Sequence, residues 1–449
     1  MTGEQLRDEL ARIAEGAPEV HVPDDLYRRG RRATTRARVA VAAAAVACLG
    51  LIAGVAVPLV AHHDVEFADS DELAVPDRIY APPSHMTDLE DDLEVGVAAG
   101  AFVTDALIPV VVEADSGTYH LLDLEGFTQG GFFRTRLGFA LSPDGEQLAW
   151  AYADDVESGH RPSGIRVADL STGRVREIRV DQDRAVLIHD LAWSTQGGWL
   201  AWLGVEMEQW DTDGVSSGKR TVGGIVREGQ SSATYQVVAG RNANRVFEQD
   251  GGQTIDGGAT SAVAVSDTGK LAAVVGWSFF LNGVRGRLEQ DPSLRIGGLW
   301  FLGEKPFGLT YSADGSDVPA VRVMPDGRSS PIRSTLDQPD LLGALGPRQV
   351  LVGPGDDGDD PSGVQLWTWN APGGGHATGT FIRLYDGVLG LTLASDLIDP
   401  VQPQVVARPR PDWPWSTDRW WWTIGGGAAS TAAIGLIVLI VVRARAVRG

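Results

Sequence analysis

Gly138-Phe-Ala-Leu-Ser-Pro-Asp-Gly-Glu-Gln-Leu-Ala-Trp150 has apolar runs on both sides of a Ser-Pro-Asp-Gly turn, and the chain repeats this pattern. The further copies are Asp190-Leu-Ala-Trp-Ser-Thr-Gln-Gly-Gly-Trp-Leu-Ala-Trp202 and Ala262-Val-Ala-Val-Ser-Asp-Thr-Gly-Lys-Leu-Ala-Ala-Val274. The turn residues that the copies share are Ser142 with Gly145, Ser194 with Gly197, and Ser266 with Gly269. Ser opening a turn and Gly supplying a positive φ are typical of β-hairpins. Each copy is therefore predicted to be a strand, a turn and a second strand.

The spacing of the copies predicts an all-β fold. They lie 52 and then 72 residues apart, and a weaker fourth copy is Leu309-Thr-Tyr-Ser-Ala-Asp-Gly315. Repeating four-strand units of roughly 40–50 residues are typical of β-propellers. At about 45 residues per blade, we expect residues 90–405 to form seven blades, with six as the alternative.

The turn Ser142-Pro143-Asp144-Gly145 resembles the S-P-D-G turn of WD40-like, TolB-type propellers. The G-H…W-D signature of standard WD40 blades is absent from the chain, so the resemblance implies the architecture only. The layout is also similar to that of membrane-anchored propeller proteins of actinobacteria.

Two apolar segments without a charged residue flank the repeats, at 39–61 and 424–442. Each has about the 20 residues that a helix needs to cross the ~30 Å hydrocarbon core of a bilayer, so we predict two transmembrane helices. A cleaved signal peptide is the alternative for the first segment. Its apolar run of 23 residues after 38 others is longer than the usual h-region of about 7–15 residues.

Arginines beside both segments predict the orientation. They are Arg28, Arg29, Arg31, Arg32, Arg36 and Arg38 before the first segment, and Arg443, Arg445 and Arg448 after the second. Juxtamembrane Arg is retained on the cytoplasmic side of a membrane. Both termini are therefore expected on the cytoplasmic side of the cell membrane and the repeats on its outer side. The predicted division is 1–38 cytoplasmic tail, 39–61 first span, 62–89 linker, 90–405 propeller, 406–423 stalk, 424–442 second span and 443–449 cytoplasmic end.

Tryptophans cluster in the stalk, namely Trp413, Trp415, Trp420, Trp421 and Trp422. Indole rings favour the headgroup layer of a bilayer, so we predict a membrane-interface belt there. A platform on which a ligand stacks is the alternative.

The section between the spans is acidic, with 27 basic and 52 acidic residues. Nucleic acid is therefore excluded as a partner, and cations, basic peptides or a basic protein fit better. The single cysteine, Cys48, lies inside the first predicted span, so the outer section has no disulfide. Three Lys against 35 Arg, with abundant Ala and Gly, indicate a GC-rich bacterial source and an envelope of actinobacterial type.

The N-terminal tail is predicted to contain a short helix with Leu6, Leu10 and Ile13 on one apolar face. This face could dock on a cytoplasmic partner, as docking elements of anti-sigma factors do. Alternatively, the tail only sets the topology and contacts anionic lipid.

The sequence contains no H-E-x-x-H or Walker motif. Asp356, Asp357, Asp359 and Asp360 are candidate calcium ligands, with a solvated loop as the alternative. We expect no catalytic residues, no cofactor and no enzyme. The predicted function is binding, sensing or scaffolding of an extracytoplasmic protein, peptide or envelope polymer. The alternatives are a propeller enzyme acting on a wall or extracellular substrate, and a transmembrane regulator of transcription acting through the tail.

Overall fold

The computed structural model describes residues 73–413, with gaps at 87, 128–137, 154–162, 181–185, 210–216, 240–245, 250–251, 256–260, 277, 288–293, 313–319, 324–328, 334–339, 347–348, 354–362, 371–373, 386, 400–404 and 412. The chain divides into two compact units, Met1–Phe67 and Ala68–Gly449, and every described residue belongs to the second. Within the described residues, no helix has the length and apolar character needed to cross a bilayer. Both predicted spans, the tail face and all nine flanking arginines lie outside the described residues.

The described residues confirm the all-β prediction: their strands form four four-stranded antiparallel sheets and one nine-stranded sheet, which contains two further four-stranded antiparallel units joined by a parallel strand pair. These six units are here named blades 1 to 6. Blades 1 to 3 consist, from first to fourth strand, of β27 (Val388–Leu393), β2 (Ala98–Thr104), β3 (Pro109–Glu113) and β4 (Tyr119–Leu121); β5 (Phe139–Leu141), β6 (Gln147–Ala153), β7 (Ser163–Asp169) and β8 (Arg174–Arg179); and β9 (Val186–Trp193), β10 (Trp199–Gln209), β11 (Ser217–Arg227) and β12 (Gln236–Ala239). Blades 4 to 6 consist of β15 (Ser261–Val265), β16 (Leu271–Val275), β17 (Ser278–Leu281) and β18 (Val284–Arg287); β19 (Leu294–Leu302), β20 (Lys305–Ser312), β21 (Ala320–Val323) and β22 (Ser329–Arg333); and β23 (Asp340–Gly346), β24 (Gln349–Gly353), β25 (Val364–Asn370) and β26 (Gly374–Leu384).

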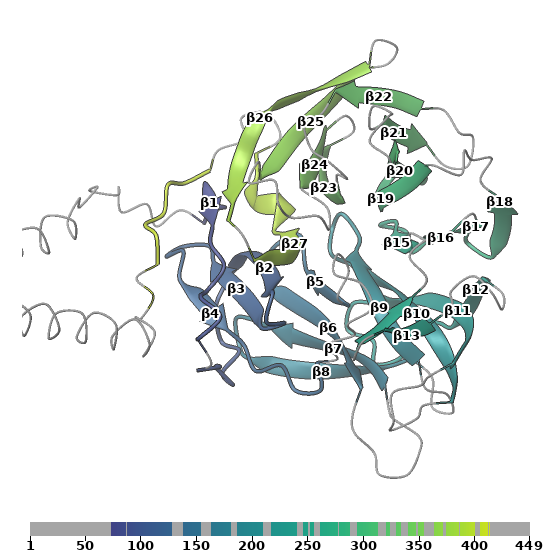
Figure 1. Ribbon diagram of the computed structural model, residues 1–449, viewed down its shortest axis with the longest axis horizontal. Helices are drawn as coiled ribbons and strands as arrows, with labels where there is room; N and C mark the ends of the chain where they lie inside the picture. Colours follow the sequence, from purple (N-terminus) through teal and green to yellow (C-terminus); the bar gives the residue numbers. More distant parts are fainter. Residues whose placement is uncertain are drawn as a thin grey trace, which may run out of the picture. The chain divides into compact units, whose positions relative to one another are not determined.

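The first strands of the blades close a ring, which can be followed by the strand labels in Figure 1. β5 contacts β9, β9 contacts β15, β15 contacts β19, β19 contacts β23, β23 contacts β27, and β27 contacts β5. Four-stranded sheets arranged in this way around a centre are a β-propeller. Among the described residues the ring closes at six blades, the smaller of the two expected numbers. Chain length suggested more because an inserted hairpin, β13 (Val246–Gln249) with β14 (Gly252–Ile255), pairs only with itself.

Both ends of the outer section help to close the ring. Blade 1 takes its first strand, β27, from the C-terminal end of the section and its other three from the N-terminal end. A short strand, β1 (Arg78–Ile79), pairs in parallel with β26 of blade 6, and β22 of blade 5 pairs in parallel with the other end of β26. A 3₁₀ turn, η1 (Ser395–Leu397), follows β27.

The segments that lead into and out of the propeller lie side by side. Pro76 and Val406 form a parallel bridge. The Asp77 N–H donates to the Val406 carbonyl at 2.9 Å, and the Val406 N–H donates to the Val75 carbonyl at 3.0 Å. The chain therefore enters and leaves the propeller at one place on blades 6 and 1.

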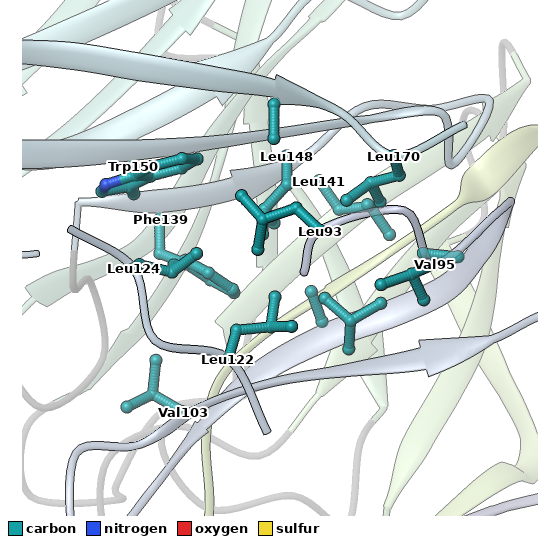
Figure 2. Close-up of a cluster of buried hydrophobic side chains, with 14 of the residues drawn as sticks. Leu93, Val95, Val103, Leu122, Leu124, Phe139, Leu141, Leu148, Trp150 and Leu170 are labelled. Carbon is teal, nitrogen blue, oxygen red and sulfur yellow. The ribbon is translucent and has the colours of Figure 1, made fainter. Parts of the chain in front are cut away.

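The core lies between successive blades, so strands such as β9, β15 and β16 are buried on both faces. All eight residues of β9 are buried, as are all five of β15 and of β16. Figure 2 shows the cluster between blades 1 and 2, in which Trp150 and Phe139 of blade 2 lie with Leu122 and Val103 of blade 1. Trp150 is 1% exposed, and its indole N–H donates to the Glu125 carbonyl at 3.2 Å, which satisfies its one polar atom.

Candidate functional site

A cavity of about 90 Å³ lies where the six first strands meet. Every blade contributes to its wall with at least one aliphatic residue, and these include, one from each blade, Leu391, Leu141, Leu191, Val263, Leu299 and Leu341. Two tryptophans, Trp193 and Trp300, are also among its lining residues. At ~30 Å³ per water molecule, the cavity has room for the end of one side chain. It is the candidate binding site.

Polar groups of the lining also hold neighbouring blades together. Asp190 is 5% exposed, and its Oδ2 accepts the Val263 N–H at 2.9 Å, which joins blade 3 to blade 4. Thr392 Oγ1 accepts the Leu141 N–H at 3.3 Å and donates to the Ala101 carbonyl at 3.2 Å, which joins blades 1 and 2. The walls of the cavity are therefore fixed by hydrogen bonds as well as by packing.

Two aspartates follow lining residues directly in the sequence. Pro143 and Ser395 line the cavity, and each is followed by an aspartate, Asp144 and Asp396. The Asp396 N–H donates to the Pro143 carbonyl at 2.9 Å, which brings the two segments together. Burial and then the charge of Asp144 raise the pKa of Asp396. A cation bound here would lower the pKa of Asp396 again, because a nearby positive charge favours the ionised carboxylate.

The repeated serines lie in the turns between the first and second strands of blades 2, 3 and 4. Gly145, Gly197 and Gly269 have φ values of 77°, 71° and 81°, and each N–H donates to the carbonyl of the turn's serine. Ser142 Oγ donates to Asp144 Oδ1 at 2.5 Å and accepts the Gln147 N–H at 2.8 Å. These contacts satisfy the polar groups within the turn, so the motif builds the hairpin.

These turns also contact one another. In the turns of blades 3 and 4, the Gln196 N–H donates to Asp267 Oδ1 at 2.9 Å. Thr268 Oγ1 donates to the carboxylate of Glu304, in the corresponding turn of blade 5, at 2.9 Å, and Lys270 Nζ lies 2.8 Å from the same carboxylate. The first-to-second-strand turns therefore form a connected set on one face of the propeller.

The fourth copy predicted from the sequence is misplaced. Leu309 lies in β20, so the pattern falls between the second and third strands of blade 5, and 313–319 lie outside the described residues. In blade 5 the first-to-second-strand turn instead contains Gly303, which has a φ of 57°. Ser312 begins a Ser-Ala-Asp-Gly string that resembles the repeated turn, whereas the turn of blade 5 that corresponds to the repeat contains no serine.

Trp413 is the one predicted interface tryptophan that the structure describes. Its ring packs edge-on against Tyr119 of β4, with 5.4 Å between the ring centroids. Trp415, Trp420, Trp421 and Trp422 lie outside the described residues, as do Asp356, Asp357, Asp359 and Asp360. Among the residues that are described, no three His, Cys, Asp or Glu side chains group closely enough to hold a metal ion.

The sequence held one overlooked signal for the cavity. At the position that the repeat fills with Gly138 and Ala262, the second copy has Asp190. The structure places this departure from the repeat in the cavity lining. Thr392 and Ser395 gave no such signal, because they line the cavity only through the return of the C-terminal strand to blade 1.

No family model matches the sequence, and no curated protein matches it. Solved structures do. One is an oligogalacturonate lyase in complex with manganese, at 12% identity over 61% of this chain and 70% of the lyase, with a TM-score of 0.36. Another is a Mycobacterium tuberculosis puromycin-hydrolyzing peptidase, at 13% identity over 61% of this chain and 42% of the peptidase, with a TM-score of 0.34.

A third similar structure is the β-propeller domain of the Trilobed protease from Pyrococcus furiosus, at 12% identity over 69% of this chain and 99% of that domain, with a TM-score of 0.31. These matches overturn the expectation that the protein is not an enzyme, since they include a lyase and a peptidase. The chain itself is a β-propeller by its strand order and closed ring of first strands.

Proposed function

We propose that the protein is a membrane-anchored, extracytoplasmic β-propeller that binds a basic peptide segment at its central cavity, near Asp144 and Asp396. The observation that carries the proposal is the cavity, with an aliphatic wall from six blades and two aspartates beside its lining. The proposal concerns binding of the peptide. Whether the bound peptide is also cleaved is measured in the same experiment.

The cavity suits a lysine or arginine side chain. Such a side chain has an apolar stem and a charged head, which prefer different surroundings. Leu391 and Leu141 offer an apolar wall to the stem, and Asp144 and Asp396 offer negative charge to the head. The excess of acidic residues in the outer section raises the local concentration of a basic partner.

The two apolar segments with their flanking arginines support the location outside the membrane. The adjacency of Pro76 and Val406 agrees with it, because a domain held by two spans is tethered through its entry and exit segments. The proposal also takes the chain to be one of the membrane-anchored propellers of actinobacterial type that its turn motif and layout resemble.

The test is a titration of the full chain, in detergent micelles, with acetyl-triarginine amide and with acetyl-triglutamate amide. Trp193 and Trp300 line the cavity, so tryptophan fluorescence reports its occupation. We expect saturable binding of the arginine peptide only. Leu391→Trp, which fills the cavity, should weaken binding at least about tenfold, a loss of ~1.4 kcal/mol.

Asp396→Asn should also weaken binding, and more so at low salt, because the contact is electrostatic. Asp115→Asn, an exposed aspartate in the turn between β3 and β4, is the matched control and should bind as the native chain does. Equal affinities of the native chain and the Leu391→Trp variant would overturn the proposal. Mass spectrometry of the peptide after incubation records whether it is cleaved.

A further inference from the structure

The outer face of the pair formed by β1 and β26 carries arginine and tyrosine side chains. In this parallel pair Arg78 lies opposite Arg383, and Ile79 lies opposite Leu384. Because side chains alternate between the faces of a strand, residues 78, 80, 383 and 385 share one face. The other face carries Ile79, which is fully buried, and Leu384, which is 8% exposed. On the first face Arg383 and Tyr385 are exposed and Arg78 is half-buried, whereas Tyr80, at 7% exposure, is buried by its neighbours.

These side chains are ordered by contacts with one another. The rings of Tyr80 and Tyr385 stack, with 4.3 Å between centroids and 17° between planes. The guanidinium of Arg410 lies 5.6 Å from the centroid of the Tyr80 ring. The Tyr80 N–H donates to Tyr119 Oη at 3.0 Å, and Tyr385 is 43% exposed. We name Arg78, Tyr80, Arg383, Tyr385 and Arg410 the tyrosine–arginine patch.

The charge of the patch is opposite to that of the section that carries it. The outer section has 27 basic and 52 acidic residues, whereas the patch contains three guanidinium groups. One acidic group lies beside it: Asp77 Oδ2 is 3.2 Å from Arg78 Nε. Guanidinium groups recognise phosphate oxygens through paired hydrogen bonds, and tyrosine rings favour the interface between water and lipid. The chemistry of the patch therefore fits an anionic, phosphate-bearing surface.

The patch lies where the chain enters and leaves the propeller, since Val406 lies beside Pro76 and Arg410 contacts Tyr80. Eleven residues separate Leu73 from the first predicted span, and ten separate Trp413 from the second. At ~3.3–3.6 Å per extended residue, each tether allows at most about 40 Å. Such short tethers keep the patch close to the membrane surface and so raise the effective concentration of that surface at the patch.

We infer that the tyrosine–arginine patch binds the phosphate headgroups of anionic phospholipids in the membrane that anchors the chain, and so orients the propeller on its surface. This inference rests on the proposed anchoring. The patch adds a specific attraction to a domain whose overall charge would be repelled by an anionic leaflet.

The test uses the full chain with Cys48→Ala, reconstituted in nanodiscs of phosphatidylcholine alone or with one third phosphatidylglycerol. A bimane label is placed at Ala407→Cys, an exposed position beside the patch, or at Val284→Cys in blade 4, which is 71% exposed in the native chain. A nitroxide on the lipid headgroup quenches the label where the two come close.

We expect quenching at position 407 in the anionic nanodiscs at least twice that in the neutral ones, and little quenching at position 284 in either. Arg383→Glu with Arg410→Glu should abolish the difference. Arg174→Glu with Arg179→Glu, two exposed arginines of β8, should leave it unchanged. Should the doubly substituted patch variant melt below the native chain, Arg410→Gln replaces it, with partial loss expected.

Extraction of native membranes with alkaline carbonate separates this inference from the anchoring on which it rests. A chain that resists extraction but shows equal quenching in both lipids keeps its anchor and overturns the patch. A chain that is extracted, yet is quenched at position 407 on preformed anionic vesicles, loses its anchor and keeps the patch. Equal loss of quenching for both pairs of arginine substitutions would reduce the effect to net charge and also overturn the inference.

Discussion

Gly145 and Gly197 occupy the same position in the turns of blades 2 and 3, and alanine at the two should have different consequences. Both glycines have a positive φ, 77° and 71°. A Cβ at Gly145 would lie 2.1 Å from the Ala98 carbonyl oxygen and 3.2 Å from the Ala394 Cβ. At Gly197 its nearest neighbour would be the Cδ of Pro143, at 3.7 Å.

The expected destabilisation follows from these distances. A positive φ costs a residue with a Cβ about 1–2 kcal/mol, and the lost chain entropy of the unfolded glycine returns about 0.4–1 kcal/mol. Gly197→Ala should therefore cost about 1 kcal/mol. Gly145→Ala adds an overlap with a backbone atom that cannot rotate away, and such overpacking costs about 1–3 kcal/mol. The two variants should differ by roughly 2 kcal/mol.

The assay is thermal unfolding of the full chain in micelles, followed by near-ultraviolet circular dichroism. With an unfolding entropy of ~2.1 cal/mol/K per residue over roughly 330 residues, a difference of 2 kcal/mol corresponds to ~3 °C in Tm. Gly229→Ala, with a φ of 77° and no atom within 4 Å of the added Cβ, is the control and should behave as Gly197→Ala does. Equal Tm values for Gly145→Ala and Gly197→Ala would refute the packing of blade 2 against Ala98 and Ala394.

Three further changes test other parts of the structure. Asp190→Ala leaves the buried Val263 N–H without its acceptor and should cost about 1–3 kcal/mol in urea unfolding, whereas Asp190→Asn keeps an acceptor and should lose less; equal losses would contradict the bond. Asp396→Asn should raise Tm at pH 7 but not at pH 3. Because the pKa of Asp396 is raised in the folded protein, ionisation of this carboxyl destabilises the fold as pH rises from its unfolded towards its folded pKa. A difference in Tm between variant and native chain that is the same at both pH values would contradict the raised pKa. Trp150→Ala should cost about 3–5 kcal/mol, compared with almost nothing for the exposed Val284→Ala, by the same unfolding assay.

The repeat was predictable because hairpin turns leave a local signature. Serine first and a glycine with positive φ fourth can be read without knowing what packs around the turn. The strand pairs that these turns connect are β5 with β6, β9 with β10 and β15 with β16, and they lie where the signature predicts them.

The number of blades was harder to predict, because it depends on pairing between distant segments. β27 joins β2 across almost 300 residues of sequence, and the hairpin of β13 and β14 lengthens the chain without adding to the ring. The same reason hid the cavity. Thr392 and Ser395 line it only because β27 completes blade 1, and no local sequence pattern around them predicts that pairing.

The tyrosine–arginine patch also escaped the sequence analysis. Arg78 and Arg383 lie far apart along the chain, and only the register of β1 on β26 places them on one face. The clustering of tryptophans predicts a membrane interface at Trp413, and its packing against Tyr119 could not be read from that pattern.

Display of the propeller outside the membrane, between two spans, is the central claim, and cysteine labelling in intact cells tests it most directly. In a chain with Cys48→Ala, one cysteine is introduced at Val284, the exposed position in blade 4, or at Glu4 in the tail. A membrane-impermeant maleimide should label position 284 in intact cells and position 4 only after permeabilisation. Labelling of position 284 only after permeabilisation would contradict the claim and place the propeller inside the cell.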